Sequence, residues 1–249
     1  MRIFTSVSDA MNEMARDLYE MGVERHTKTM QDRNIVDDYN FYTKELTNVS
    51  FAITRPIDGL DEIFILPEQG KYKEWADSEF NERIDVKHIN PGVAWMLRPD
   101  LWSEFLLRNK GRFSYTYNER IRVQLERIVE ILKIDIMTRQ AILAIWNPIV
   151  DVPKIGIDRV PCSLYYHFMA NGNNDIVELD MVYAMRSCDF INHMPNDVYL
   201  AIRLLEFVCD TIGANLGKFF MNVSSLHYYK KDEHVLDKFM CGKIGGTNG

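Results

Sequence analysis

The stretch from residue 162 to residue 213, CSLYYHFMANGNNDIVELDMVYAMRSCDFINHMPNDVYLAIRLLEFVCDTIG, decides the fold class of this chain. Residues 162–170 and 175–187 are rich in apolar, aromatic and β-branched side chains, which predicts two strands. Residues 171–174, Asn-Gly-Asn-Asn, are typical of a hairpin turn, because asparagine and glycine accept a positive φ. Residues 196–213 are apolar nearly all round, which predicts a buried helix ending near the last glycine. Strands and a buried helix side by side indicate an α+β or α/β domain.

The flanking regions add elements of both kinds. Further strands are predicted at residues 139–146 and 217–229, and amphipathic helices at residues 7–22 and 119–134. Ser8 is the expected cap of the first helix. The pattern predicts a large mixed sheet flanked by helices.

Composition narrows the class of protein. The chain has 249 residues, of which 47% are hydrophobic, so residues 1–249 are predicted to form one domain with a substantial core. A net charge of −7 argues against a nucleic-acid partner held by bulk charge. The N-terminal residues lack the apolar run of a signal peptide, and no apolar run is long enough to span a membrane. We expect a cytoplasmic protein with no membrane partner, in the host cytoplasm if it is phage-encoded.

The four cysteines, Cys162, Cys188, Cys209 and Cys241, have no metal-ligand spacing, so no metal is expected. Cys162 follows Arg159-Val160-Pro161, and a nearby arginine can lower the pKa of a thiol and make it a nucleophile. On these residues alone, a cysteine buried for packing remains the better-supported interpretation.

Three other clusters could carry chemistry. Arg186-Ser187 at a predicted strand end and Arg139 before another strand suit a phosphate. His227-x-Tyr229 could hydrogen-bond a sugar hydroxyl. Each is also compatible with an ordinary surface ion pair, a solvated charge or a common His-x-Tyr pair.

The order and spacing of these clusters are more specific than any one of them. The series Thr138-Arg139, Trp146-Asn147, Pro161-Cys162, Arg186-Ser187-Cys188-Asp189, Pro195-x-Asp197, His227-x-Tyr229 resembles the thymidylate synthase superfamily. The resemblance covers residues 110–230 well and the first hundred residues poorly.

The resemblance implies a reaction. In that family a cysteine thiolate adds to C6 of a pyrimidine nucleotide, and C5 then attacks the one-carbon unit of methylenetetrahydrofolate. Cys162 is the implied thiolate. Arg186 and Ser187 are implied to hold the 5′-phosphate.

The resemblance also implies a composite site in a homodimer. Arg139 would reach the phosphate site of the neighbouring subunit. His227 and Tyr229 would bind the ribose, Asp189 the pterin, and Tyr117 would lie near the C5 proton.

Two residues of the family pattern are placed in the poorly matched half. The catalytic glutamate is expected at Glu74, with Asp77 as the second choice, and the mobile phosphate arginine at Arg33. The glycine-rich residues 242–249 are expected to be flexible.

Asp197 bears on the choice of base. The family's uracil-specific members carry asparagine here, whereas an ionised aspartate only accepts hydrogen bonds and matches the amino group of cytosine. Asp197 would also help to protonate N3 of the base as Cys162 adds to C6. In this respect Met185–Asp197 resembles the bacteriophage deoxycytidylate (dCMP) 5-hydroxymethylases. The leading expectation is hydroxymethylation of dCMP, or CMP, with methylenetetrahydrofolate as co-substrate.

Two alternatives stay open. One is a C5-methyltransferase of thymidylate synthase type acting on dCMP or dUMP. The other is a nucleotide-binding relative without catalysis, which Gln140 in place of the family's second arginine favours.

Overall fold

The computed structural model describes residues 1–30, 33–36, 38–64, 70–107, 110–152, 159–172 and 177–245. In these ranges the central feature is an eight-stranded sheet with the order β1-β5-β10-β8-β7-β6, in which β2 also pairs with β5 and β9 with β10. Its strands are β1 (Arg2–Phe4), β2 (Val23–Arg25), β5 (Thr43–Ile53), β6 (Ile142–Ala144), β7 (Ser163–Gly172), β8 (Val177–Met185), β9 (Cys188–Asp189) and β10 (Asn215–Tyr229). A second, two-stranded sheet pairs β3 (Thr29–Met30) with β4 (Arg33–Asn34).

The sheet is mixed. β7 runs antiparallel to both β6 and β8, and β10 runs antiparallel to β5. β8 and β10 are parallel, and the helix between them makes the crossover that parallel neighbours require. The prediction of a mixed sheet flanked by helices in an α+β domain is therefore confirmed.

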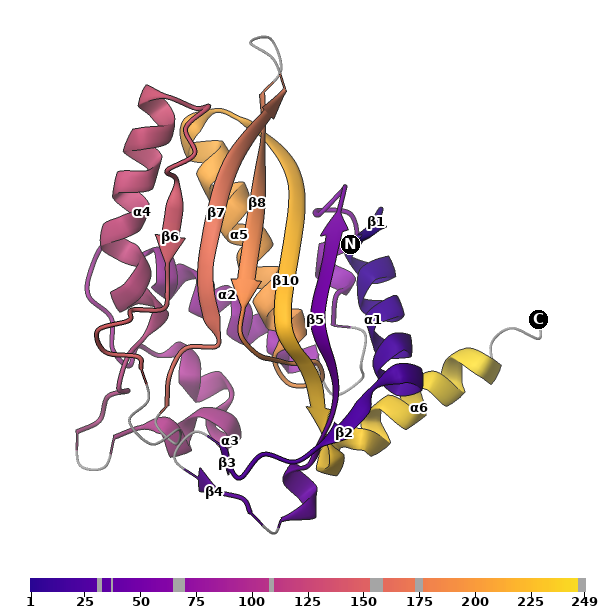
Figure 1. The fold of residues 1–249 in the computed structure, drawn as a ribbon. Coiled ribbons are helices and arrows are strands. Elements are labelled where there is room, and N and C mark those ends of the chain that lie inside the picture. The colour runs from indigo at the N-terminus through magenta and orange to yellow at the C-terminus, as the bar shows by residue number, and fades with distance from the viewer. Residues whose placement is uncertain are drawn as a thin grey trace.

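The helices cover one face of the sheet. They are α1 (Val7–Met21), α2 (Gly70–Ile84), α3 (Pro99–Trp102), α4 (Tyr117–Ile134), α5 (Met194–Ile212) and α6 (Glu233–Gly245). In Figure 1, α5 and α2 lie behind the sheet, α4 flanks the β6 edge, and α1 and α6 lie beyond β5. Among the described residues, no helix lies over the front face in this view.

The core lies between the sheet and α5. Twelve residues of α5 are buried, because its sequence is apolar around most of its circumference. Phe168, Tyr183 and Phe219, on three neighbouring strands, point to the same side and are fully buried. The alternate residues Tyr165 and Met169 of β7 are 37% and 41% exposed, so the front face is partly apolar and open.

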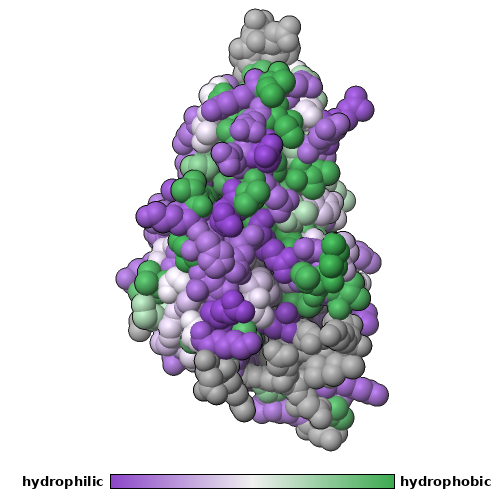
Figure 2. All heavy atoms as spheres, turned by 90° about the vertical axis from the view of Figure 1, so that its left-hand side faces the viewer, coloured by the Kyte–Doolittle hydropathy of each residue, from purple (hydrophilic) through white to green (hydrophobic). Residues whose placement is uncertain are grey.

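The β6 edge has a mixed surface. Figure 2 views the molecule from this side and shows hydrophobic side chains interspersed with hydrophilic ones. Val123 and Ile134 of α4 and Ile142 of β6 are among the exposed apolar residues of the chain.

Some local predictions were wrong. No strand was predicted before residue 139, yet β5 spans Thr43–Ile53 because its partners β10 and β1 supply the hydrogen bonds. The cap of α1 is Ser6 rather than Ser8, since the Ser6 hydroxyl accepts from Asp9 N and the Asp9 carboxylate accepts from Ser6 N. Of the tail expected to be flexible, residues 242–245 continue α6, and residues 246–249 lie outside the described residues.

Candidate active site

A cavity of about 190 Å³ opens at the end of the sheet where β8 and β10 finish and β7 begins. Its walls come from α2, the segment before α4, the segment before β7, the connection from β8 to α5, and the end of β10. The lining includes seven of the predicted site residues: Tyr117, Cys162, Ser187, Asp189, Asp197, His227 and Tyr229. The fold thus brings together residues that lie far apart in the sequence.

The Cys162 thiol lies directly before β7 and is held from one side by Arg186. Arg186 donates from Nε to Pro161 O at 2.8 Å and from Nη2 to Val160 O at 3.0 Å. Its Nη2 also lies 3.7 Å from Cys162 Sγ. Burial raises the pKa of the Cys162 thiol above its usual value, and the Arg186 guanidinium opposes that shift. A positive charge beside the sulfur stabilises the thiolate, which is the nucleophilic form of cysteine.

Arg186 was predicted to hold a phosphate together with Ser187. Ser187 lines the cavity, whereas Arg186 lies behind the thiol and fixes the segment that carries it. The phosphate role of Arg186 stays a prediction.

Asp197 lies in the first turn of α5, which follows the cavity-lining connection from β8. Cys188 Sγ lies 3.6 Å from Asp197 Oδ2 and can donate to it. Burial raises the pKa of Asp197 to about 6, against the opposing effect of the Arg83 guanidinium. The carboxyl group therefore changes between donor and acceptor close to neutral pH.

Asp189 is a second carboxylate on the same wall. Its Oδ1 accepts from Ile191 N and Asn192 N, at 3.0 and 3.1 Å, and its Oδ2 accepts from Asn192 Nδ2 at 3.0 Å. These bonds fix the turn between β9 and α5. They also fix the direction in which the carboxylate faces the cavity.

His227 and Tyr229 end β10 next to this turn. Their rings meet edge to face with centroids 5.4 Å apart. His227 O accepts from Phe190 N at 2.7 Å, and Ser225 Oγ lies 3.2 Å from His227 Nδ1. Burial lowers the pKa of His227, so the imidazole is neutral and can accept or donate a hydrogen bond.

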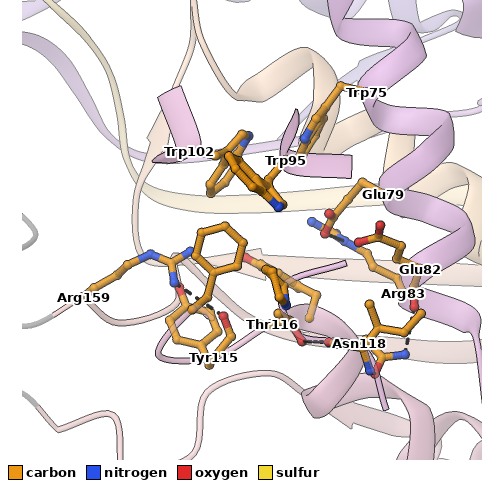
Figure 3. A pocket seen from close by; sticks show the side chains of 14 residues that line it. Trp75, Glu79, Glu82, Arg83, Trp95, Trp102, Tyr115, Thr116, Asn118 and Arg159 are labelled. Atoms are coloured by element: carbon orange, nitrogen blue, oxygen red, sulfur yellow. Dashed lines mark hydrogen bonds and ion pairs between the residues drawn. The ribbon is translucent and has the colours of Figure 1, made fainter. Parts of the chain in front are cut away.

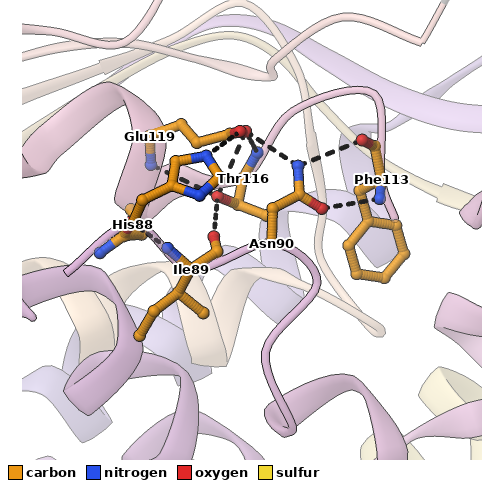
Figure 4. A network of polar contacts seen from close by, with 7 residues as sticks. His88, Ile89, Asn90, Phe113, Thr116 and Glu119 are labelled. Carbon is orange, nitrogen blue, oxygen red and sulfur yellow. Dashed lines mark hydrogen bonds and ion pairs between the residues drawn. The ribbon is translucent and has the colours of Figure 1, made fainter. Parts of the chain in front are cut away.

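Tyr117 begins α4 and is placed by a polar network around the helix start (Figure 4). Thr116 and Glu119 form a capping box, in which Thr116 N donates to Glu119 Oε2 at 2.8 Å. Glu119 also accepts from His88 Nε2 at 2.7 Å and from Asn90 Nδ2 at 3.0 Å. The network ties the segment around residue 90 to the start of α4.

Four predicted residues lie elsewhere. Glu74 is exposed on α2 and Asp77 pairs with Lys73 at 3.1 Å; the cavity lining includes neither. Arg139 is exposed beside β6, and its carbonyl oxygen accepts from His167 Nε2 at 3.1 Å. Arg33 lies in β4, and its side chain is outside the described residues.

On α2, Glu79 borders a cavity next to the site, whereas Glu74 borders neither cavity. Glu79 lines a second cavity of about 40 Å³, which shares Trp75, Arg83 and Tyr117 with the first (Figure 3). Positions 75, 79 and 83 follow one face of α2 at helical spacing, whereas Glu74 points away. That i, i+4 spacing was the signal in the sequence that could have identified Glu79.

Glu79 and Arg83 form a partly buried ion pair. Arg83 Nε lies 2.9 Å from Glu79 Oε1, and the Arg83 guanidinium lies 3.9 Å from the Tyr117 ring centre. Burial raises the pKa of Glu79 despite this partner.

Sequence reasoning also missed two cavity residues at the site. His193 precedes α5, and burial lowers its pKa to about 4, so its imidazole is neutral at pH 7. Arg159 lies among aromatic rings, with its guanidinium 4.4 Å from the Tyr115 ring centre. Arg159 was noted beside Cys162, but nothing in the sequence places it against these rings.

Among the described residues, no group of three or more His, Cys, Asp or Glu side chains could hold a metal ion. Within the same ranges, no helix is both long and apolar enough to cross a bilayer.

A half-buried thiol, two carboxyl groups and neutral imidazoles around one cavity define a small-molecule site with a candidate cysteine nucleophile. The family model described as thymidylate synthase matches residues 27–241. The chain therefore belongs to the thymidylate synthase family.

Individual relatives agree with this assignment. A protein of Methanococcoides burtonii named "Putative thymidylate synthase" is 31% identical over 140 residues, which cover 54% of this chain and 61% of that protein. A protein of the same name from Methanothermobacter marburgensis is 28% identical over 211 residues, covering 82% and 86%. The bifunctional dihydrofolate reductase-thymidylate synthase of Paramecium tetraurelia is 29% identical over 213 residues, covering 85% and 42%. The match thus spans about three fifths of the Methanococcoides relative.

Proposed function

We propose that this protein transfers a one-carbon unit from methylenetetrahydrofolate to C5 of a pyrimidine 5′-monophosphate. The observation that carries the proposal is one cavity lined by the Cys162 thiol, the Asp197 carboxyl and the Tyr117 hydroxyl. In this account Cys162 adds to C6 of the base, Asp197 binds the edge of the base, and Tyr117 lies near the C5 proton. Ser187, His227 and further cavity groups hold the phosphate and sugar.

The identity of Asp197 supports cytosine as the base. An ionised carboxylate accepts from the exocyclic amino group of cytosine but faces the O4 acceptor of uracil unfavourably. This favours dCMP, and with water as the final reactant the product is the 5-hydroxymethyl nucleotide.

The relatives support a second candidate at least as strongly, namely the synthesis of thymidylate from dUMP. Their names refer to thymidylate synthase. The pKa of Asp197 near 6 also makes this candidate chemically accessible, because the protonated carboxyl group donates a hydrogen bond to O4. The base and the final step are therefore the points for experiment.

The site suits the folate co-substrate that this activity needs. The Trp75 and Trp102 rings stack with centroids 5.5 Å apart, and both residues line the cavity. Their buried indole N–H groups have no hydrogen-bond partner among the described residues, so they are available to a ligand or to water. Flat aromatic walls suit a pterin, and Asp189 can accept from its N–H groups. When bound, the folate supplies the one-carbon unit.

We also propose a homodimer in which Arg139 serves the partner's site. Within one chain Arg139 lies beside His167, five residues along β7 from Cys162, or about 17 Å at the usual strand rise. That separation is too long for the side chain to reach its own cavity. The open front face, with Ile142, Tyr165 and Met169 exposed, offers a surface for a second copy.

The test is to incubate the protein with dCMP or dUMP, tetrahydrofolate and formaldehyde, and to identify the nucleotide product by mass. A gain of CH₂O on dCMP supports hydroxymethylation, and a gain of CH₂ supports methylation. The Cys162→Ser variant is the control and should give neither. An unchanged nucleotide mass with both substrates contradicts the proposal.

A further inference from the structure

A chain of three hydroxyl groups lies behind the cavity. Ser163, the first residue of β7, is fully buried, and its Oγ lies 2.9 Å from Tyr117 Oη and 2.5 Å from Tyr183 Oη. The three side chains come from α4, β7 and β8, so the contact joins three separately placed elements. Of the three residues, only Tyr117 lines the main cavity.

The hydrogen-bonding capacity of hydroxyl groups gives this chain a direction. Ser163 Oγ has one proton to donate and two lone pairs to accept, so it can donate to one tyrosine while it accepts from the other. When Ser163 donates to Tyr117, the Tyr117 proton is free to point into the cavity. When Tyr117 donates to Ser163, a lone pair of Tyr117 faces the cavity. Changing direction requires only rotation of the three hydroxyl groups, and no proton enters or leaves the chain.

The surroundings keep the phenols neutral and in place. Burial raises the pKa of both Tyr117 and Tyr183 well above the usual tyrosine value. The Tyr183 ring stacks on Tyr166 with centroids 4.4 Å apart and an interplanar angle of 15°. On the other side Arg83 lies over the Tyr117 ring at 3.9 Å. With both rings packed, the Ser163 contact fixes the remaining freedom, which is the orientation of the Tyr117 hydroxyl.

We propose that Ser163 is a positioning residue that holds the Tyr117 hydroxyl toward the cavity and sets whether it donates or accepts there during removal of the C5 proton. The inference rests on the proposed function and deepens it. It assigns a role to Ser163, next to the proposed nucleophile, and to Tyr183 as its second hydroxyl partner. The buried Tyr166 hydroxyl also contacts Ser163 and Tyr183 and belongs to the same group.

A purely structural role makes a different prediction. If Ser163 only satisfied two buried phenols, its loss would lower the melting temperature and leave the rate per folded molecule unchanged. A positioning role lowers the rate of C5 proton removal and leaves nucleotide affinity nearly unchanged, because Ser163 does not line the cavity.

The experiment measures release of tritium from C5 of the nucleotide, its Kd and the melting temperature for Ser163→Ala. We expect kcat for tritium release to fall about tenfold to a hundredfold, with Kd within about twofold of wild type. Tyr183→Phe should also slow release, and adding it to Ser163→Ala should cause little further loss, since both remove one chain. Tyr19→Phe, on α1 and outside the lining of both cavities, removes one tyrosine hydroxyl elsewhere and is the control, which should match wild type.

Two results overturn the inference. One is tritium release by Ser163→Ala within about twofold of wild type, and the other is losses from Ser163→Ala and Tyr183→Phe that multiply in the double variant. If wild type itself releases no tritium from dCMP or dUMP, the proposed function fails instead. In that case NMR tests the contact itself. The hydroxyl proton of Tyr117 is assigned from its absence in Tyr117→Phe. It should be protected from exchange with solvent in wild type and lose that protection in Ser163→Ala. Unchanged protection contradicts the contact itself.

Discussion

Substitution of Asp197 by asparagine tests how the site selects its base. In wild type the pKa of Asp197 is about 6, so the carboxyl group is about 10% ionised at pH 5 and about 99% ionised at pH 8. The ionised form matches the amino group of cytosine and the protonated form matches O4 of uracil. The preference for dCMP over dUMP should therefore rise with pH in wild type.

The expected change in the ratio of kcat/KM for dCMP and dUMP follows from the strength of one buried hydrogen bond. A matched or mismatched hydrogen bond is worth about 1–3 kcal/mol, or roughly fivefold to 150-fold in kcat/KM. We expect the dCMP to dUMP ratio of wild type to rise at least about tenfold from pH 5 to pH 8. Asp197→Asn should shift the ratio toward dUMP and remove its dependence on pH, since an amide does not titrate.

The assay is competition between the two nucleotides in one reaction, read by mass, at several pH values. Ionisation of Cys162 affects both substrates alike and cancels in the ratio. A wild-type ratio that stays constant across pH 5 to 8, together with an unchanged ratio in Asp197→Asn, would refute this account of base selection.

Four further outcomes follow from the site. Cys162→Ser should abolish tritium release from C5 while nucleotide binding, measured by calorimetry, persists; near-normal release would remove the thiol from this role. Mixing Cys162→Ser subunits with Arg139→Ala subunits should restore some activity through heterodimers, and an active species that is monomeric in ultracentrifugation would exclude the shared site. Glu79→Gln should reduce kcat strongly while Glu74→Gln, one helix face away, should not, and equal effects would show that α2 has been placed wrongly. Thr116→Ala removes the cap of α4 and should cost about 1 kcal/mol in the free energy of unfolding, checked by urea denaturation; no loss would contradict the role of the capping box.

The second half of the chain was predictable because its signals are local. The helix at α5 is apolar around most of its circumference, and the residues of the Arg186–Asp197 segment lie close together in sequence, so their pattern identifies both the element and the site. Cys162 and His227 were assigned roles only through the order and spacing of the whole series, because on the residues alone each also fitted an ordinary structural role.

In the first half of the chain, the sequence patterns that indicate elements and site residues are weaker, for physical reasons. α2 is mostly polar, so the i, i+4 spacing of Trp75, Glu79 and Arg83 is a weak signal until tertiary contacts show that these residues face inward. The expectation of a catalytic glutamate at Glu74 therefore fell on an exposed residue that lines neither cavity, and the identity of that glutamate stays a prediction. The Ser163 contact was equally hidden, because a serine after Cys162 becomes informative only when the fold brings two tyrosine hydroxyls to it.

The central claim is that Cys162 forms a covalent bond to the pyrimidine ring within this cavity. Intact-protein mass spectrometry after incubation with methylenetetrahydrofolate and 5-fluoro-dCMP or 5-fluoro-dUMP tests it, because fluorine at C5 cannot leave as the proton does. The account predicts a protein species heavier by nucleotide plus folate, with the added mass on the peptide that contains Cys162 and none in Cys162→Ser. An unmodified protein with both analogues, or an adduct on another cysteine, would contradict it.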